Sequence, residues 1–167
     1  MPGDEKIDKV FQKGKNYALY LLNYRDLSRF EIYKKLKQKG YPELTIEKVI
    51  GYLEDSGLVD DKKFALKFAL SRVKKSFASR KIKYLLKNKG IEEDIIDEVV
   101  KDVFSSIDEE KMARELLFKK RYLPLKKKIG KEEKIRHFSK IYRFLSSYGF
   151  SYSVIEKIVN IEIRMGS

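Results

Sequence analysis

The sequence predicts an all-α fold of three tandem three-helix repeats that form an elongated, curved right-handed array. The main observation is a stretch that occurs three times, at residues 32–41, 82–91 and 141–150. In each copy an Ile lies eight positions before a Gly, a Leu lies four before it, and a large apolar residue follows. An Ile and a Leu four positions apart share one helix face, and Gly suits the left-handed position that ends a helix. No segment alternates apolar and polar residues between turn signals, so we expect no strands.

The first predicted repeat, together with the N-terminal segment, covers residues 1–58. Apolar residues at helical spacing predict its first helix, and whether that helix begins near the start of the chain or frays there stays open. Ser28 and Glu31 have the spacing of a capping box, in which the Ser hydroxyl accepts from the Glu amide and the Glu side chain reaches back. They begin a second helix that ends at Gly40, and the third helix ends at Gly57.

The second and third repeats are predicted at residues 59–106 and 107–167. Each opens with acidic residues, of which Asp60 is placed to cap a helix, and acids in a first turn complement the positive end of the helix. The third repeat carries a basic insertion, residues 119–131, that breaks helical structure, and Ser151 is placed to cap its last helix. A single repeat is too small to bury a core of its own, so neighbouring repeats must share one.

Composition limits the classes of partner and chemistry. The 167 residues carry a formal net charge of +13 and 38% of them are charged, which favours nucleic acid, anionic lipid or an acidic protein as the partner. The absence of Cys excludes disulfides and zinc-thiolate sites, and the sequence contains no Walker or dinucleotide-binding glycine motif. No apolar run is long enough to span a bilayer and the first residues are unlike a signal peptide, so we expect a cytoplasmic protein without membrane contact.

Three motifs with fixed spacing carry a family resemblance. They are the capping box Ser28-Arg29-Phe30-Glu31, the run Gly57-Leu58-Val59-Asp60-Asp61-Lys62-Lys63-Phe64-Ala65, and the glycine stretch of the later repeats. The positions that define them are Ser28, Glu31, Gly40, Asp60, Asp61, Phe64, Gly90 and Gly149. The pattern extends over residues 17–159 and resembles the RecX family of regulators of the RecA recombinase. The chain departs from it at Ala78, where the family usually has Gly, and at Tyr148, where it often has a basic residue.

The resemblance implies a function that helical periodicity does not reveal. RecX-like proteins bind the RecA–DNA filament along its helical groove and inhibit its ATPase and strand-exchange activities in recombination and DNA repair, by blocking extension or promoting disassembly. The resemblance also implies DNA binding, to single and double strands, and it brings no catalytic residue and no cofactor. We expect a monomer. Ala78 could stiffen the break at which it lies, and Tyr148 puts one phosphate contact in doubt.

Two basic blocks support nucleic-acid binding independently of the resemblance. The first, from Lys67 to Lys89, contains no acidic residue, and the second, from Lys119 to Arg143, is interrupted only by Glu132 and Glu133. A merely solvated helix face usually mixes signs, so contact with phosphates or with the filament is favoured over solvation. The residues predicted to bind are Lys67, Arg72, Lys74, Lys75, Arg80, Lys81, Lys83, Lys87, Lys119, Lys120, Arg121, Lys126, Lys127, Lys128, Arg136, Lys140 and Arg143.

Several alternatives stay open at this point. Tyr122 could stack on an exposed base, but packing of its ring onto the bundle is favoured, and His137 is interpreted as a surface or interface side chain. The acidic pair at Asp60 and Asp61 is interpreted as helix capping rather than as a metal or catalytic site, so no enzyme is expected. The rival functions are a sequence-independent nucleic-acid-binding protein without a recombinase partner, a helical scaffold for an acidic protein, and a nuclease.

Overall fold

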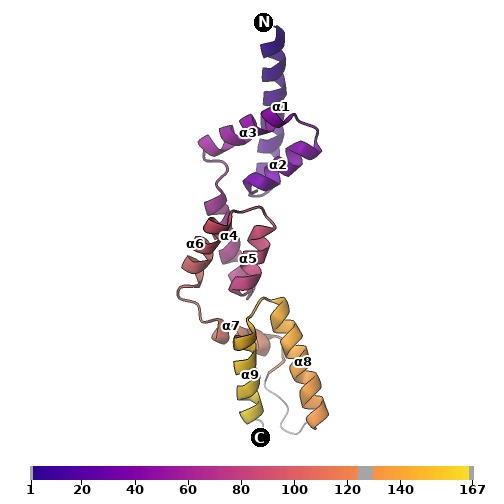
Figure 1. Ribbon diagram of the computed structural model, residues 1–167, viewed down its shortest axis with the longest axis vertical. Coiled ribbons are helices and arrows are strands. Elements are labelled where there is room, and N and C mark those ends of the chain that lie inside the picture. Colours follow the sequence, from indigo (N-terminus) through magenta and orange to yellow (C-terminus); the bar gives the residue numbers. More distant parts are fainter. Residues whose placement is uncertain (1, 124–129, 166–167) are drawn as a thin grey trace. The chain divides into compact units, whose positions relative to one another are not determined.

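The computed structural model describes residues 2–123 and 130–165, and within these residues all regular structure is helical. The helices are α1 (Pro2–Tyr24), α2 (Arg29–Gln38), α3 (Glu43–Asp55), α4 (Asp61–Val73), α5 (Ser79–Lys87), α6 (Glu93–Phe104), α7 (Glu109–Lys119), α8 (Lys131–Ser147) and α9 (Tyr152–Met165) (Figure 1). The predicted all-α class with tandem three-helix repeats is therefore confirmed. Within the described part of the chain, no helix combines the length and the apolar character needed to cross a bilayer.

The chain divides into two compact units. Unit 1 contains the residues up to Phe68 together with Leu86–Ile96, and unit 2 contains Ala69–Leu85 together with the residues from Asp97 onward. This division passes through α4, α5 and α6, the helices of the predicted second repeat. The limits of the three predicted repeats therefore stay a prediction, although the order of three helices in each repeat is observed.

The core of unit 1 lies where α1, α2 and α3 pack together (Figure 1). Ile32 and Leu36, the Ile and Leu of the recurring stretch, are both fully buried on one face of α2. Ala18 of α1 is also fully buried, and its small side chain lets neighbouring helices approach closely. The buried members of this core are Ala18, Leu27, Ile32, Leu36, Ile46, Val49, Ile50, Leu53 and Val59. Helix α1 is continuous from Pro2, which answers the question that the sequence left open.

The core of unit 2 is built mainly by α7, α8 and α9. Ile141 and Leu145 of the third recurring stretch are fully buried, and Phe150, which follows the glycine, is 2% exposed. Burial of one such side chain stabilises the folded state by about 1.5–3 kcal/mol. The buried members of this core are Ala78, Ala113, Leu116, Leu117, Leu123, Ile141, Leu145, Phe150, Ile155 and Ile158. The same stretch therefore supplies buried residues to the cores of both units.

The predicted caps begin the helices as expected. Ser28 and Glu31 form a complete capping box at α2, in which the Ser28 hydroxyl accepts from the Glu31 amide. The Asp60 carboxylate accepts from the Lys63 amide at 2.9 Å, and the Ser151 hydroxyl accepts from the Val154 amide at 3.3 Å. These bonds satisfy amides that no preceding turn can reach, which fixes where each helix begins.

Candidate nucleic-acid interface

The start of α2 packs against the turn between α5 and α6. The Ser28 hydroxyl donates to the Lys89 carbonyl at 2.6 Å, and the Arg29 amide donates to Asp61 Oδ1 at 2.8 Å. Phe30 covers Gly90 so closely that a Cβ added to this glycine would lie 2.3 Å from the Phe30 Cβ. We call this contact, formed by residues 28–31, Asp61 and residues 89–90, the first junction. It lies within unit 1.

The start of α5 makes the equivalent contact with the turn between α8 and α9. The Ala78 amide donates to the Tyr148 carbonyl at 2.9 Å, and the Ser79 amide donates to Glu109 Oε1 at 2.7 Å. A Cβ added to Gly149 would lie 2.5 Å from the backbone nitrogen of Lys81. We call this contact, formed by residues 78–81, Glu109 and residues 148–149, the second junction. It lies within unit 2, and it shows that the recurring glycine stretch has a structural role.

The first junction is electrostatically balanced around Glu31, whose side chain is 15% exposed. Its carboxylate accepts from Lys89 Nζ at 2.7 Å, from the Arg25 guanidinium at 3.1 and 3.3 Å, and from the Ser28 amide at 3.3 Å. Burial raises the pKa of Glu31, but these hydrogen bonds outweigh that effect and hold the pKa below its usual range. The acid is therefore ionised, and it neutralises cations that face it.

The second junction is positive rather than balanced, because Arg80 and Lys81 outnumber Glu109. Lys81 and Tyr148 hold the places that Glu31 and Lys89 hold in the first junction, as the spacing from the buried Ile and from the glycine shows. The Tyr148 ring packs on Phe77, with ring centroids 5.1 Å apart, and on Phe144 at 4.9 Å. Position 81 holds Lys where the first junction has Glu31. A basic residue at position 148 would therefore find no acidic partner at position 81. The second junction therefore has the Tyr148 ring stack where the first has the Lys89–Glu31 ion pair.

Three of the predicted binding residues are paired with acids. Lys67 Nζ lies 3.0 Å from Asp26, Lys83 Nζ lies 2.5 Å from Asp97, and Lys87 Nζ lies 3.1 Å from Glu93. The acids come from the α1–α2 connection and from α6, so the block is free of acids along the sequence but not in space. An exposed ion pair contributes about 0–1 kcal/mol, so its lysine can exchange the acid for a phosphate at small cost, but its local field is reduced.

Most of the other predicted binding residues gather in unit 2 and form no ion pair with any residue that the structure describes. They are Lys74, Lys75, Arg80, Lys81, Lys119, Lys120, Arg121, Arg136, Lys140 and Arg143. Lys74 and Lys75 follow the end of α4, in a turn that Ser76 closes with a φ of 59°. Arg72 is half-buried in α4. Lys126, Lys127 and Lys128 lie outside the described residues.

Tyr122, just after α7, makes an aromatic contact that the sequence partly predicted. Tyr122 stacks on Phe144 with ring centroids 4.9 Å apart, and it packs against the core of unit 2, which confirms packing as the role of its ring. His137 is half-buried, and its Nε2 lies 3.0 Å from the Tyr122 carbonyl. A carbonyl only accepts, so Nε2 carries the proton. His137 thus contacts the chain that follows α7, and its interpretation as a surface or interface side chain stays a prediction.

The acidic clusters act as caps. Asp60 caps α4, and its bond from the Lys63 amide lowers its pKa, whereas burial raises the pKa of Asp61 beside the Arg29 amide. Asp108 accepts from the amides of Glu110 and Lys111 at the start of α7. Within the described ranges, no group of three His, Cys, Asp or Glu side chains converges as a metal site. Asp60 and Asp108 therefore cap their own helices, as the sequence predicted, whereas Asp61 accepts from an amide of α2.

Sequence reasoning missed three exposed tyrosines beside the second junction. Tyr84, Tyr142 and Tyr152 line one cavity together with Arg80 and Lys81. A signal for two of them was present, because Tyr84 lies two positions after a buried Ile and Tyr142 lies one position after another. At these spacings a side chain points away from the buried helix face. Aromatic residues on that face, next to cations, are typical of nucleic-acid contacts.

Comparisons with known proteins agree on one family. Residues 15–53 match the model of the first three-helix domain of RecX, and residues 60–100 match that of the second. The regulatory protein RecX of Clostridium tetani is 34% identical over 163 residues, which cover 94% of this chain and 73% of the relative. The RecX of Chlorobium phaeobacteroides is 36% identical over 152 residues, covering 90% and 94%. The crystal structure of RecX from Lactobacillus salivarius has the same fold, with a TM-score of 0.71 and 24% identity over 93% of this chain and 97% of that one.

Proposed function

The chain belongs to the RecX family of regulatory proteins, and we propose that it binds the RecA–DNA filament and inhibits its ATPase and strand-exchange activities. In this role it acts in recombination and DNA repair in the cytoplasm, as a monomer, through binding alone. It carries out no reaction and needs no cofactor. The regulatory class follows from the family, and the partner and the direction of the effect are the content of the proposal.

The observation that carries the proposal is the group of cations in unit 2 without acidic partners among the described residues. Lys74 and Lys75 in the α4–α5 turn, and Arg80 at the start of α5, belong to this group. DNA binding depends first on such contacts to phosphates, which carry no sequence information.

The two junctions support the choice of unit 2 as the binding part. At the first junction Glu31 pairs with both Lys89 and Arg25, which reduces the positive field that these side chains offer a phosphate. At the second junction Lys81 takes the place of the acid. We therefore expect DNA to contact the second junction and the basic residues of α8, Lys140 and Arg143.

The proposal is tested by titrating the chain into RecA assembled on single-stranded DNA and measuring the rate of ATP hydrolysis. We expect the rate to fall as the chain is added, with less inhibition at high salt because phosphate contacts release counterions. A hydrolysis rate that stays constant at saturating protein and low salt would overturn the proposal.

The same titration identifies the alternative of a sequence-independent nucleic-acid-binding protein. In that case the chain binds free DNA, measured by fluorescence anisotropy of a labelled strand, while the ATPase rate and strand exchange are unchanged. Binding to RecA in the absence of DNA would instead support a scaffold for a protein partner. Cleavage of plasmid DNA in the presence of Mg²⁺ would restore the nuclease hypothesis.

A further inference from the structure

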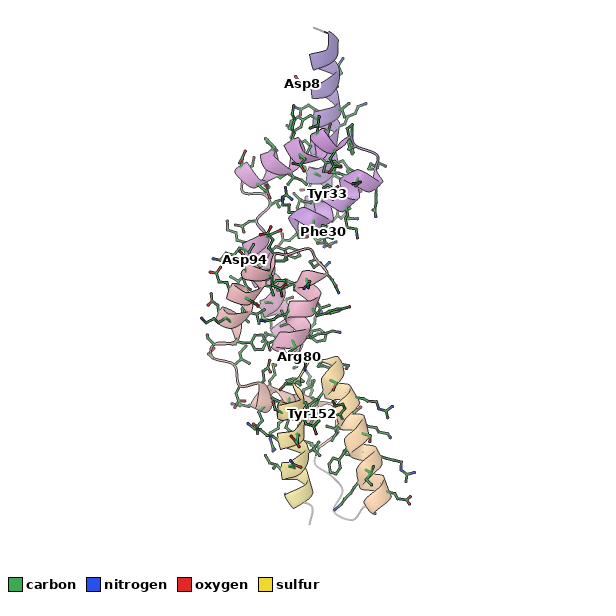
Figure 2. The ribbon with its side chains drawn as sticks, in the orientation of Figure 1. Asp8, Phe30, Tyr33, Arg80, Asp94 and Tyr152 are labelled. Atoms are coloured by element: carbon green, nitrogen blue, oxygen red, sulfur yellow. The ribbon has the colours of Figure 1, made fainter. Side chains whose placement is uncertain are left out.

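A cavity of about 320 Å³ opens beside the second junction, between the start of α5, the end of α8 and the start of α9. We call it the tyrosine notch and define it by Arg80, Lys81, Tyr84, Tyr142 and Tyr152. Figure 2 labels Arg80 and Tyr152, which come from α5 and α9 and line the same cavity. All five residues belong to unit 2.

The three tyrosines of the notch are exposed to solvent. Tyr84 is 58% exposed, Tyr142 is 43% exposed and Tyr152 is 61% exposed. The Tyr142 and Tyr152 rings meet edge to face, with centroids 6.1 Å apart and planes at 66°, so this contact meets only one face of one of the two rings. Aromatic rings gathered around a cavity and left open to solvent mark a binding site more often than a structural one.

The charge of the notch is positive. Arg80 and Lys81 line it, Lys81 Nζ lies 5.5 Å from the centroid of the Tyr84 ring, and none of the described residues that line the cavity is acidic. The amide of Ser79 at the start of α5 is already bound by Glu109, so an anion in the notch would meet the two side chains rather than the helix end. This combination of cations and open aromatic faces suits a ligand that carries both a phosphate and a flat ring.

We propose that the tyrosine notch binds one unpaired base of single-stranded nucleic acid, which stacks on its tyrosines while Arg80 and Lys81 hold the neighbouring phosphates. A cavity of this volume lies at the lower end of the range for small-molecule sites, about 300–1,000 Å³, so it takes one base rather than a base pair. In a duplex both faces of each base are covered by neighbouring base pairs. The notch therefore favours single strands, whereas the other basic residues contact phosphates of either form.

This inference rests on the proposed function, because the filament brings the DNA to the notch. It extends that function by stating that the notch recognises single-stranded DNA. A protein segment is the rival occupant. It is disfavoured by the notch itself, because a cavity with two cations and no acid among its described lining selects an anion. The larger groove on the other side of Tyr142 and Tyr152 differs, since it is mostly apolar and contains Glu156.

The first test uses Tyr152→Trp as a reporter of stacking. The chain has no Trp, so all tryptophan emission comes from this position. We expect a thymidine strand of about a dozen nucleotides, which matches the site sizes of single-strand binding proteins, to quench the emission. An abasic strand of the same length has the same phosphates without bases, and it is expected to leave the emission nearly unchanged. Equal quenching by both strands would overturn the proposal.

The second test compares two triple variants by affinity. Replacing Tyr84, Tyr142 and Tyr152 by Leu keeps apolar bulk but removes the flat rings, and we expect single-strand affinity to fall by about 10- to 100-fold, since stacking contributes strongly for each base. Replacing the same residues by Phe keeps the rings and should keep the affinity within about twofold for the same reason. Duplex affinity should be equal in both variants. Equal losses for Leu and Phe would overturn the proposal, because the hydroxyl groups would then carry the effect.

These measurements use free strands without recombinase, so they separate the inference from the proposed function. Base-dependent quenching with no effect on the RecA ATPase would support the notch and reject the filament role. ATPase inhibition without base-dependent quenching would reject the notch alone. A Leu triple variant that binds single strands normally but no longer inhibits the ATPase would also overturn the notch proposal, because the tyrosines would then contact protein.

Discussion

The first and second junctions share their packing geometry and differ in charge. In both, the start of a helix packs on the glycine turn of the next repeat, and the amide one position after Ser28 or Ala78 donates to an acid in the first turn of the next repeat's first helix. In the first, Glu31 pairs with Lys89, whereas in the second Lys81 Nζ lies over the Tyr84 ring and Tyr148 packs on Phe77. The repeat therefore fixes the backbone geometry, while the side chains within it decide whether a junction is balanced or positive.

The glycine of the first repeat completes the comparison. Gly40, Gly90 and Gly149 all have positive φ, of 87°, 72° and 90°. A Cβ added to Gly40 would meet no atom within 4 Å, whereas at Gly90 and Gly149 it would collide with Phe30 and Lys81. All three glycines end a helix, but only the last two also pack against the start of the second helix of the preceding repeat. The recurring stretch therefore has two structural roles: its glycine ends a helix in all three copies, and in two copies it also packs against the start of another helix.

The largest expected effect comes from adding a methyl group at these glycines. Gly40→Ala meets backbone strain alone and should lower the free energy of unfolding by about 1–2 kcal/mol. Gly90→Ala and Gly149→Ala meet the same strain together with a collision, which adds about 1–3 kcal/mol. Urea denaturation followed by circular dichroism measures the difference, and Gly40→Ala is the matched control. Three equal losses would mean that the junctions relax freely and would break the comparison.

The next effect concerns binding and tests which cations contact DNA. Replacing Lys74, Lys75 and Arg80 by Ala removes charges that no described acid neutralises, and we expect the slope of log affinity against log salt for single strands to fall by up to about 2. The control replaces Lys67, Lys83 and Lys87, which removes the same number of charges but leaves three acids without their lysines.

The control variant should change the slope less, since part of the positive field of these lysines is already cancelled. Both slopes are measured by fluorescence anisotropy between low and moderate salt. If the control variant loses as much of the slope as the first, ion pairing within the chain does not select the contact residues.

The contrast between Lys83 and Arg80 shows where sequence reasoning reached its limit. The absence of acids between Lys67 and Lys89 is a fact about the sequence, and it predicts a strongly positive helix. Asp97 reaches Lys83 because α6 lies beside α5, an arrangement that depends on packing between helices rather than on spacing along one of them. The helices, their caps and the glycine turns are local features, and for that reason the sequence predicted them.

The notch shows that local sequence patterns also miss residues that only tertiary contacts bring together. Arg80 and Lys81 were predicted as binding residues from local charge, and they do line the cavity. Tyr142 and Tyr152 lie about 60 to 70 residues away in the sequence, and they reach the cavity because the Gly149 turn docks on the start of α5. That docking is a tertiary contact, so no local pattern could place these tyrosines beside the two cations.

The balanced charge of the first junction predicts a pH dependence that the second lacks. At neutral pH, Glu31→Gln should lower the free energy of unfolding by about 2 kcal/mol, because it weakens charge-assisted hydrogen bonds and leaves Lys89 without its partner. The pKa of Glu31 is lower in the folded protein than its unfolded value of about 4.3, so the advantage of Glu is complete above that value. It is lost as pH falls through the lowered folded pKa.

The measurement is urea denaturation of the wild-type chain and the variant from neutral pH to below pH 4. Lys81→Gln at the equivalent position of the second junction is the control, and it should change stability by less than about 0.5 kcal/mol at every pH, as for most surface substitutions. A difference between the wild type and Glu31→Gln that persists unchanged in acid would show that packing, rather than charge, holds the first junction.

The smallest expected effect lies at Ala78, where the family usually has Gly. In the first junction the Ser28 side chain makes the bond to the next turn, whereas in the second the Ala78 backbone amide makes it. Ala78→Gly therefore keeps that bond and should cost only the extra backbone entropy of Gly, about 0.5–1 kcal/mol. Ser28→Ala removes both the cap and the bond to Lys89, and it should cost about 1–2 kcal/mol. Hydrogen exchange at the amide of residue 78 shows whether Ala78 stiffens the folded chain or restricts the unfolded chain. If Ala78 stiffens the folded chain, this amide should exchange faster in Ala78→Gly. A loss of stability without any change in local exchange would place the effect in the unfolded chain.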